Sequence, residues 1–114
     1  MKHAAPTIVA VFCVLAAGPA IAAEQGDYQQ GKTVFQDWCA PCHSPGPKHP
    51  GTQALDALYK GEKPAALEQR TDLTPEIVST FVRNGVSIMA PFRKTEIGDA
   101  DLAALGAYLS RNSK

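Results

Sequence analysis

Two cysteines three positions apart, followed at once by a histidine, constrain this chain more than any other feature of its sequence. The segment is Cys39-Ala40-Pro41-Cys42-His43. A CxxCH pattern is typical of c-type haem attachment: each thiol forms a thioether with the macrocycle, and the imidazole that follows binds the iron. We therefore expect Cys39 and Cys42 to hold one haem covalently, with His43 as an axial iron ligand.

Three other interpretations of the two thiols stay open from the motif alone. A redox disulfide of the thioredoxin kind belongs in a βαβ context, and the sequence has no convincing strand pattern. Structural zinc requires four Cys or His ligands, and outside the motif residues 24–114 offer only His49. A plain structural disulfide is compatible with export. Because His49 lies six positions after His43, we expect it to be a loop residue and not a rival iron ligand.

The first 23 residues have the pattern of a signal peptide. Lys2 precedes an apolar run, and Ala20-Ile21-Ala22 supplies the small residues that a signal peptidase reads, with cleavage after Ala22 or Ala23. A retained membrane anchor is the alternative, for which the apolar run is short. Cleavage would remove Cys13 and leave one domain of 91 residues, 24–114, with formal net charge −1. This balance gives no basic surplus to indicate nucleic acid binding.

The remaining sequence predicts helices joined by irregular segments. After a loose lead-in at 24–28, apolar spacing predicts a helix from Gln29 to about Cys39, although Gly31 lies inside it. Three prolines and two glycines predict a stiff loop over 44–52. Short helical segments are expected at 53–59 and 64–69. A longer helix should follow, capped by Thr74 and ended near Gly85. After an irregular segment at 86–95, a last helix is expected at about 100–111, beginning at Gly98 or Asp99.

The prolines of the loop also have an expected role beside His43. A metal-bound histidine usually donates its second ring N–H to a carbonyl, which fixes the orientation of the ring. We expect the carbonyl of Pro50, or secondly that of Pro47, to be this acceptor.

Met89 is the predicted second axial ligand. It is the only methionine after residue 23, and it lies 46 positions after His43 in a proline-containing segment. A thioether ligand raises the reduction potential of haem iron. With both axial positions filled by the protein, the iron exchanges electrons only. With Met89 detached, the alternative is a haem sensor or a peroxidase. No acid/base pair, nucleophile arrangement or phosphate loop indicates another enzyme.

Taken together, these features resemble the class I, or mitochondrial-type, cytochromes c over the whole of residues 24–114. The resemblance implies a small all-α fold of about four or five helices around one covalently bound haem, with the first and last helices crossing at near right angles. It places Gly31 and Phe35 against Leu105 and Tyr108. It also implies periplasmic location, because c-type haem is attached outside the cytoplasmic membrane in bacteria.

The segment from Val82 to Phe92 is most similar to the cytochrome subunit of p-cresol methylhydroxylase and related flavocytochromes, although Pro91 comes one residue later here than in many relatives. This similarity implies an electron carrier that is not itself an enzyme, with a flavin-dependent, phenol-oxidising dehydrogenase subunit as electron donor. The alternative within electron transfer is a free shuttle that serves an oxidase or a quinoprotein. No membrane anchor is expected after cleavage.

Two further groups of residues follow from a bound haem. Carboxylates buried with the macrocycle need charged or hydrogen-bonding partners, and the expected donors are Trp38, Tyr59 and Arg70. A rim of cations around an exposed haem edge would steer a partner protein electrostatically. The candidates for this rim are Lys48, Lys60, Lys63, Arg93 and Lys94.

Overall fold

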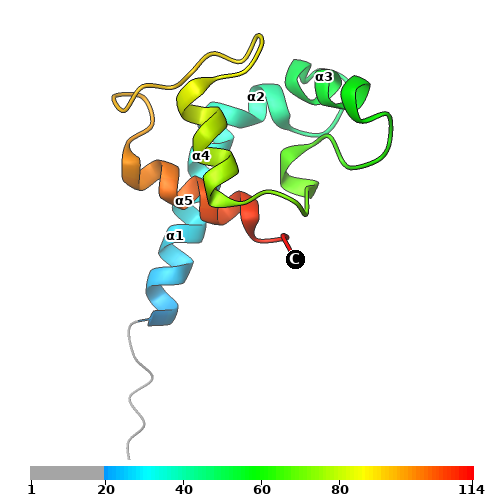
Figure 1. Cartoon of the computed structure of the whole chain (residues 1–114). Coiled ribbons are helices and arrows are strands. Elements are labelled where there is room, and N and C mark those ends of the chain that lie inside the picture. The colour runs from blue at the N-terminus through cyan, green and yellow to red at the C-terminus, as the bar shows by residue number, and fades with distance from the viewer. Residues whose placement is uncertain (1–19) are drawn as a thin grey trace, which may run out of the picture.

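The computed structural model describes residues 20–114, and their side chains from residue 27 onward. Its elements in chain order are α1 (Ala20–Val34), the π-helical η1 (Phe35–Cys39), α2 (Ala40–His43), α3 (Pro50–Tyr59), the 3-10 turn η2 (Leu67–Gln69), α4 (Pro75–Asn84) and α5 (Asp99–Ser110) (Figure 1). No strand is formed in this part of the chain, so the expected all-α fold is confirmed. Residues 1–19, which include Cys13 and most of the expected signal peptide, lie outside the described residues.

Several expected boundaries were wrong. Residues 24–28 are helical and not a loose lead-in, because α1 already begins at Ala20. The proline-rich loop ends before Pro50, which occupies the first position of α3, where the missing N–H of proline costs nothing. Between residues 64 and 69 only the last three form a helical turn.

The helix α5 crosses α1 at a point where Gly31 faces it (Figure 1). A Cβ atom on Gly31 would lie 2.2 Å from the carbonyl oxygen of Ala104 and 2.7 Å from Cβ of Tyr108. Only a glycine therefore permits this approach. One turn further along, the ring centroids of Phe35 and Tyr108 lie 6.0 Å apart, and Leu105 is fully buried in the same core. The expected packing of this pair against the last helix is confirmed.

A π-helical turn follows the first helix and ends at Cys39, the first residue of the haem-attachment motif. It spans Phe35–Cys39, so that α1, η1 and α2 follow one another without a loop. Such a turn holds one residue more than an α-helical turn and shifts the register of every side chain after it. Phe35, the first residue of the turn, faces the α5 crossing, and Cys39, its last residue, is also buried. No sequence pattern predicted this change of register.

The helix α4 has the capping that its sequence predicts. Thr74 Oγ1 accepts a hydrogen bond from the N–H of Ile77 at 3.3 Å, and Gly85 ends the helix with φ +68°. Its buried face, Val78 and Val82, joins the core around α5. Together with α3 and η2, this face surrounds the site described next.

Candidate haem site

A cavity of about 220 Å³ opens between α3, α4, α5 and the irregular segment after α4. Its lining is mostly aliphatic and aromatic. The cavity also receives the side chains of Cys39, His43 and Met89, and those of Tyr59 and Arg70. Residues 46 positions apart in the sequence, His43 and Met89, therefore share one apolar cavity.

The two cysteines are free thiols, with Cys39 buried and Cys42 exposed. Burial, and secondly the neighbouring Cys42, raises the pKa of Cys39 to about 12. A reactive redox thiol has a lowered pKa, so Cys39 lacks the property that a thioredoxin-like cysteine requires. Within residues 20–114, no group of three or more His, Cys, Asp or Glu side chains is placed to hold a metal ion. The described residues therefore offer no four-ligand set of the kind that structural zinc requires.

His43 has the properties of a ligand that lacks its partner. Its Nδ1 atom is buried and makes no hydrogen bond with any described residue. Burial lowers the pKa of the imidazole, which favours its neutral form. This Nδ1 atom lies against the backbone at Gly51 and not at an iron position. The fit to iron rests on the neutral imidazole, which a metal ligand requires, and on the place of His43 in the cavity lining beside Cys39 and Met89.

The expected carbonyl partner of His43 is not found. Neither Pro50 nor Pro47 accepts a hydrogen bond from the His43 ring, and the Pro47 carbonyl accepts one from the Gln53 side chain instead. His49 Nδ1 lies 3.0 Å from the carbonyl oxygen of Pro41, and His49 does not line the cavity. The loop thus folds back on the motif through its side chains.

Gly51 is a site residue that the sequence did not single out. A Cβ atom there would lie 2.7 Å from Cε1 of His43, 2.9 Å from its Nδ1 and 2.7 Å from the carbonyl oxygen of Cys42. The backbone of α3 therefore packs directly on the imidazole ring, and Thr52 Oγ1 donates to the carbonyl of Ser44 at 2.9 Å beside it. A glycine directly after a proline at a predicted loop end was the available signal.

The Met89 segment is fixed by short-range contacts. The N–H of Val86 donates to the Met89 carbonyl and the N–H of Met89 to the Val86 carbonyl, both at 2.9 Å. A Cβ atom on Gly85 would lie 2.5 Å from the Met89 carbonyl oxygen. The N–H of Phe92 donates to the Val82 carbonyl at 2.8 Å, which returns the segment to α4. Met89 is thereby held at the cavity despite the shifted Pro91.

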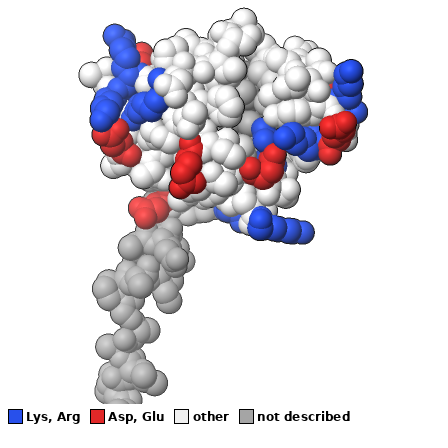
Figure 2. All heavy atoms as spheres, viewed as in Figure 1, with Lys and Arg blue, Asp and Glu red and all other residues white. Residues whose placement is uncertain are grey.

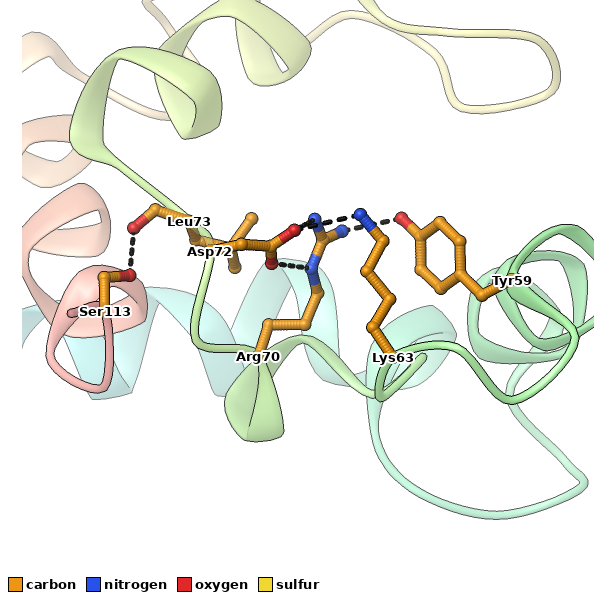
Figure 3. Close-up of polar contacts among 6 residues, drawn as sticks. All are labelled: Tyr59, Lys63, Arg70, Asp72, Leu73 and Ser113. Carbon is orange, nitrogen blue, oxygen red and sulfur yellow. Dashed lines mark hydrogen bonds and ion pairs between the residues drawn. The ribbon is translucent and has the colours of Figure 1, made fainter.

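One edge of the cavity is polar. The Arg70 guanidinium donates from Nη1 to the Tyr59 hydroxyl at 2.7 Å, and from Nε and Nη2 to the Asp72 carboxylate at 2.7 and 2.8 Å (Figure 3). Lys63 Nζ donates to the same carboxylate at 2.9 Å. Tyr59 and Arg70 line the cavity as expected, whereas Trp38 does not: it packs on Phe92 with ring centroids 5.9 Å apart.

The expected cationic rim is largely neutralised by the chain itself. Figure 2 shows blue and red side chains intermixed on both flanks, with an uncharged stretch of surface between them. None of the five candidate cations lines the cavity. Three of them form ion pairs at 2.9, 3.2 and 2.8 Å: Lys63 with Asp72, Arg93 with Glu96 and Lys94 with Asp99.

The fold and this cavity together define a small all-α, c-type monohaem cytochrome, an electron-transfer protein with covalently bound haem c. A family model described as cytochrome c oxidase, cbb3-type, subunit III matches residues 26–109. The chain belongs to this family. Comparison with curated proteins and with solved structures found no match. Among residues 20–114, no helix has the length and apolar character needed to cross a membrane.

Proposed function

We propose that this chain is an exported cytochrome that carries single electrons through a haem tethered at Cys39 and Cys42, with His43 and Met89 as axial ligands. The observation that carries the proposal is the cavity, in which Cys39, His43 and Met89 meet on an apolar lining. Bound haem c would supply reversible one-electron transfer between ferric and ferrous iron.

The chain's own residues have distinct tasks in this proposal. His43 would present a neutral imidazole nitrogen, with its ring held by the backbone at Gly51. Met89 would bind the iron with a neutral thioether, which favours the ferrous state. Arg70 and Tyr59 would meet the haem propionates, since buried carboxylates require charged or hydrogen-bonding partners. The apolar lining would limit the contact of water with a bound macrocycle.

The test of the proposal is spectroscopic. The purified protein should show sharp reduced haem bands that survive acid–acetone extraction, together with the weak far-red band of ferric iron bound to methionine sulfur. Met89→Ala should abolish that band, lower the potential and admit cyanide or CO. The matched control is Ile88→Ala, because Ile88 is 85% exposed beside Met89; it should change none of these. Unchanged potential and ligand exclusion in Met89→Ala would assign the sixth position to another residue.

The same measurements separate the alternative functions. A far-red band in the native protein agrees with a closed iron and electron transfer. Its absence at neutral pH would indicate an open or differently ligated haem, and peroxidase activity and gas binding would then distinguish a peroxidase from a sensor. If no haem resists acid–acetone extraction, the two thiols would instead have a disulfide or zinc-binding function.

We further propose a periplasmic location and a flavin-dependent, phenol-oxidising dehydrogenase subunit as electron donor. The support is the signal-like sequence of residues 1–23 and the similarity of residues 82–92 to flavocytochrome subunits. The mass of the protein in a periplasmic fraction should correspond to cleavage after Ala22 or Ala23. In stopped-flow measurements, reduction of the cytochrome by such a dehydrogenase should be faster than its reduction by a quinoprotein and faster than its oxidation by an oxidase. The reverse order of these rates would identify a free shuttle.

A further inference from the structure

The polar edge of the cavity contains one residue with no direct contact to the cavity itself. Asp72 does not line it, whereas Arg70 and Tyr59 do. The Arg70 side chain is 11% exposed and the Asp72 side chain 43%, so the carboxylate lies on the solvent side of the guanidinium. Figure 3 shows the guanidinium between the Asp72 carboxylate and the Tyr59 ring.

The Asp72 carboxylate holds the Arg70 guanidinium by a bidentate pair of hydrogen bonds. Its two oxygens accept from Nε and Nη2 of Arg70, the planar arrangement that fixes an arginine fork most firmly. Lys63 Nζ also donates to this carboxylate, at 2.9 Å. Rotation of the Arg70 fork would break both contacts at once.

These hydrogen bonds leave some donors of Arg70 and Tyr59 unused. Arginine has five N–H donors, and the contacts to Asp72 and Tyr59 use three of them. One N–H on Nη1 and one on Nη2 therefore remain, as does the Tyr59 O–H, which accepts from Arg70 and can still donate. These donors belong to side chains that line the cavity.

We propose that Asp72 is a positioning residue that holds Arg70 and, through it, Tyr59 toward a carboxylate of the bound haem. The inference rests on the proposed haem site. A positive charge near the haem favours the ferrous state, so Arg70 raises the reduction potential only as long as Asp72 keeps its guanidinium at the cavity edge. Asp72 thus governs how strongly Arg70 acts on the iron.

A double-mutant cycle on the reduction potential tests this role. At a fixed ambient potential, Arg70→Met should lower the ratio of reduced to oxidised protein about tenfold. This corresponds to a reduction potential lower by about 59 mV for a one-electron couple. The same substitution in an Asp72→Asn background should lower the ratio by less than about threefold, since the guanidinium is no longer held there. Asp72→Glu, which keeps the carboxylate, should restore most of the dependence on Arg70. If Arg70→Met fails to load haem, Arg70→Gln takes its place in the cycle.

The outcome that overturns the inference is additivity. If two fixed charges act independently, Arg70→Met changes the ratio by the same factor in both backgrounds, to within about twofold; a larger effect without Asp72 also refutes it. The Arg93–Glu96 pair, at 3.2 Å and off the cavity, is the matched control, and its cycle should leave the potential unchanged. Failure of the haem proposal is distinguishable, because the wild-type protein would then lack the reduced haem bands altogether.

Discussion

The close approach of α1 and α5 makes Gly31→Ala the sharpest test of the fold. The new methyl group would lie 2.2 Å from the Ala104 carbonyl oxygen and 2.7 Å from Cβ of Tyr108. The obstacle is helix backbone, which cannot rotate away, so the helices must separate by about 1 Å to restore normal contacts. That separation loosens the buried pair Phe35 and Leu105 at the same crossing.

The expected loss follows from two opposing effects. Overpacking a tight interface costs about 3 kcal/mol when the neighbour is rigid, and replacing a helix-interior glycine with alanine returns about 1 kcal/mol. The net destabilisation is about 2 kcal/mol, which lowers the melting temperature by roughly 8–16 °C for a domain of this size. Thermal unfolding followed by circular dichroism measures it.

The matched control is Gly98→Ala, whose Cβ atom would meet nothing closer than 3.9 Å, the Asp101 carboxylate. Because Gly98 is the N-cap of α5, where glycine is preferred to alanine, we expect this control to cost up to about 1 kcal/mol and so less than Gly31→Ala. If Gly31→Ala instead matched or exceeded the wild-type stability, the helix-propensity gain would be the only effect present. The close packing of α1 on α5 would then be refuted.

Three other substitutions test local features. Gly85→Ala places a methyl group 2.5 Å from the Met89 carbonyl at φ +68°, and should abolish the far-red iron–methionine band while leaving helical circular dichroism unchanged. Thr74→Ala removes the cap of Ile77 and should cost about 1 kcal/mol in urea unfolding, with Thr71→Ala as an exposed control. Hydrogen bonds from Arg70, and secondly from Lys63, hold the pKa of Asp72 well below its usual range. The stability that these ion pairs give the folded protein is therefore present above the ordinary aspartate pKa and is lost as the pH falls below that value. Asp72→Asn should therefore cost about 0.5–1 kcal/mol at pH 7, with the difference from wild type shrinking in acid titrations of stability; a constant difference would contradict the ion pair.

Local sequence signals predicted those parts of the fold that neighbouring residues determine. Thr74, Pro75 and Gly85 marked the ends of α4 because capping and φ restriction act within a few residues. Gly31 stood out as a glycine inside the first predicted helix, and the family resemblance placed it with Phe35 against the last helix. The start of α1 was missed, because residues 24–28 carry few apolar side chains and no cap.

The haem-attachment motif was likewise readable from sequence alone, since both tethers and the ligand lie within five residues. The arrangement around it was not. No sequence pattern marked the π-helical turn Phe35–Cys39, and the role of Gly51 depends on where the His43 ring lies. Trp38 was expected at the cavity, but it lies within the π-helical turn and packs on Phe92 instead.

The sequence by itself determined the cofactor chemistry, the all-α class and the positions of the main helices, because each depends on residue type and short-range spacing. Tertiary structure alone decided that Met89 reaches the cavity of His43. It also decided that Arg70 and Lys63 both donate hydrogen bonds to Asp72. In addition, it decided that three of the five cations expected to steer a partner are paired within the chain. Contacts of this kind join side chains whose meeting is set by the packing of whole helices, for which no local pattern exists.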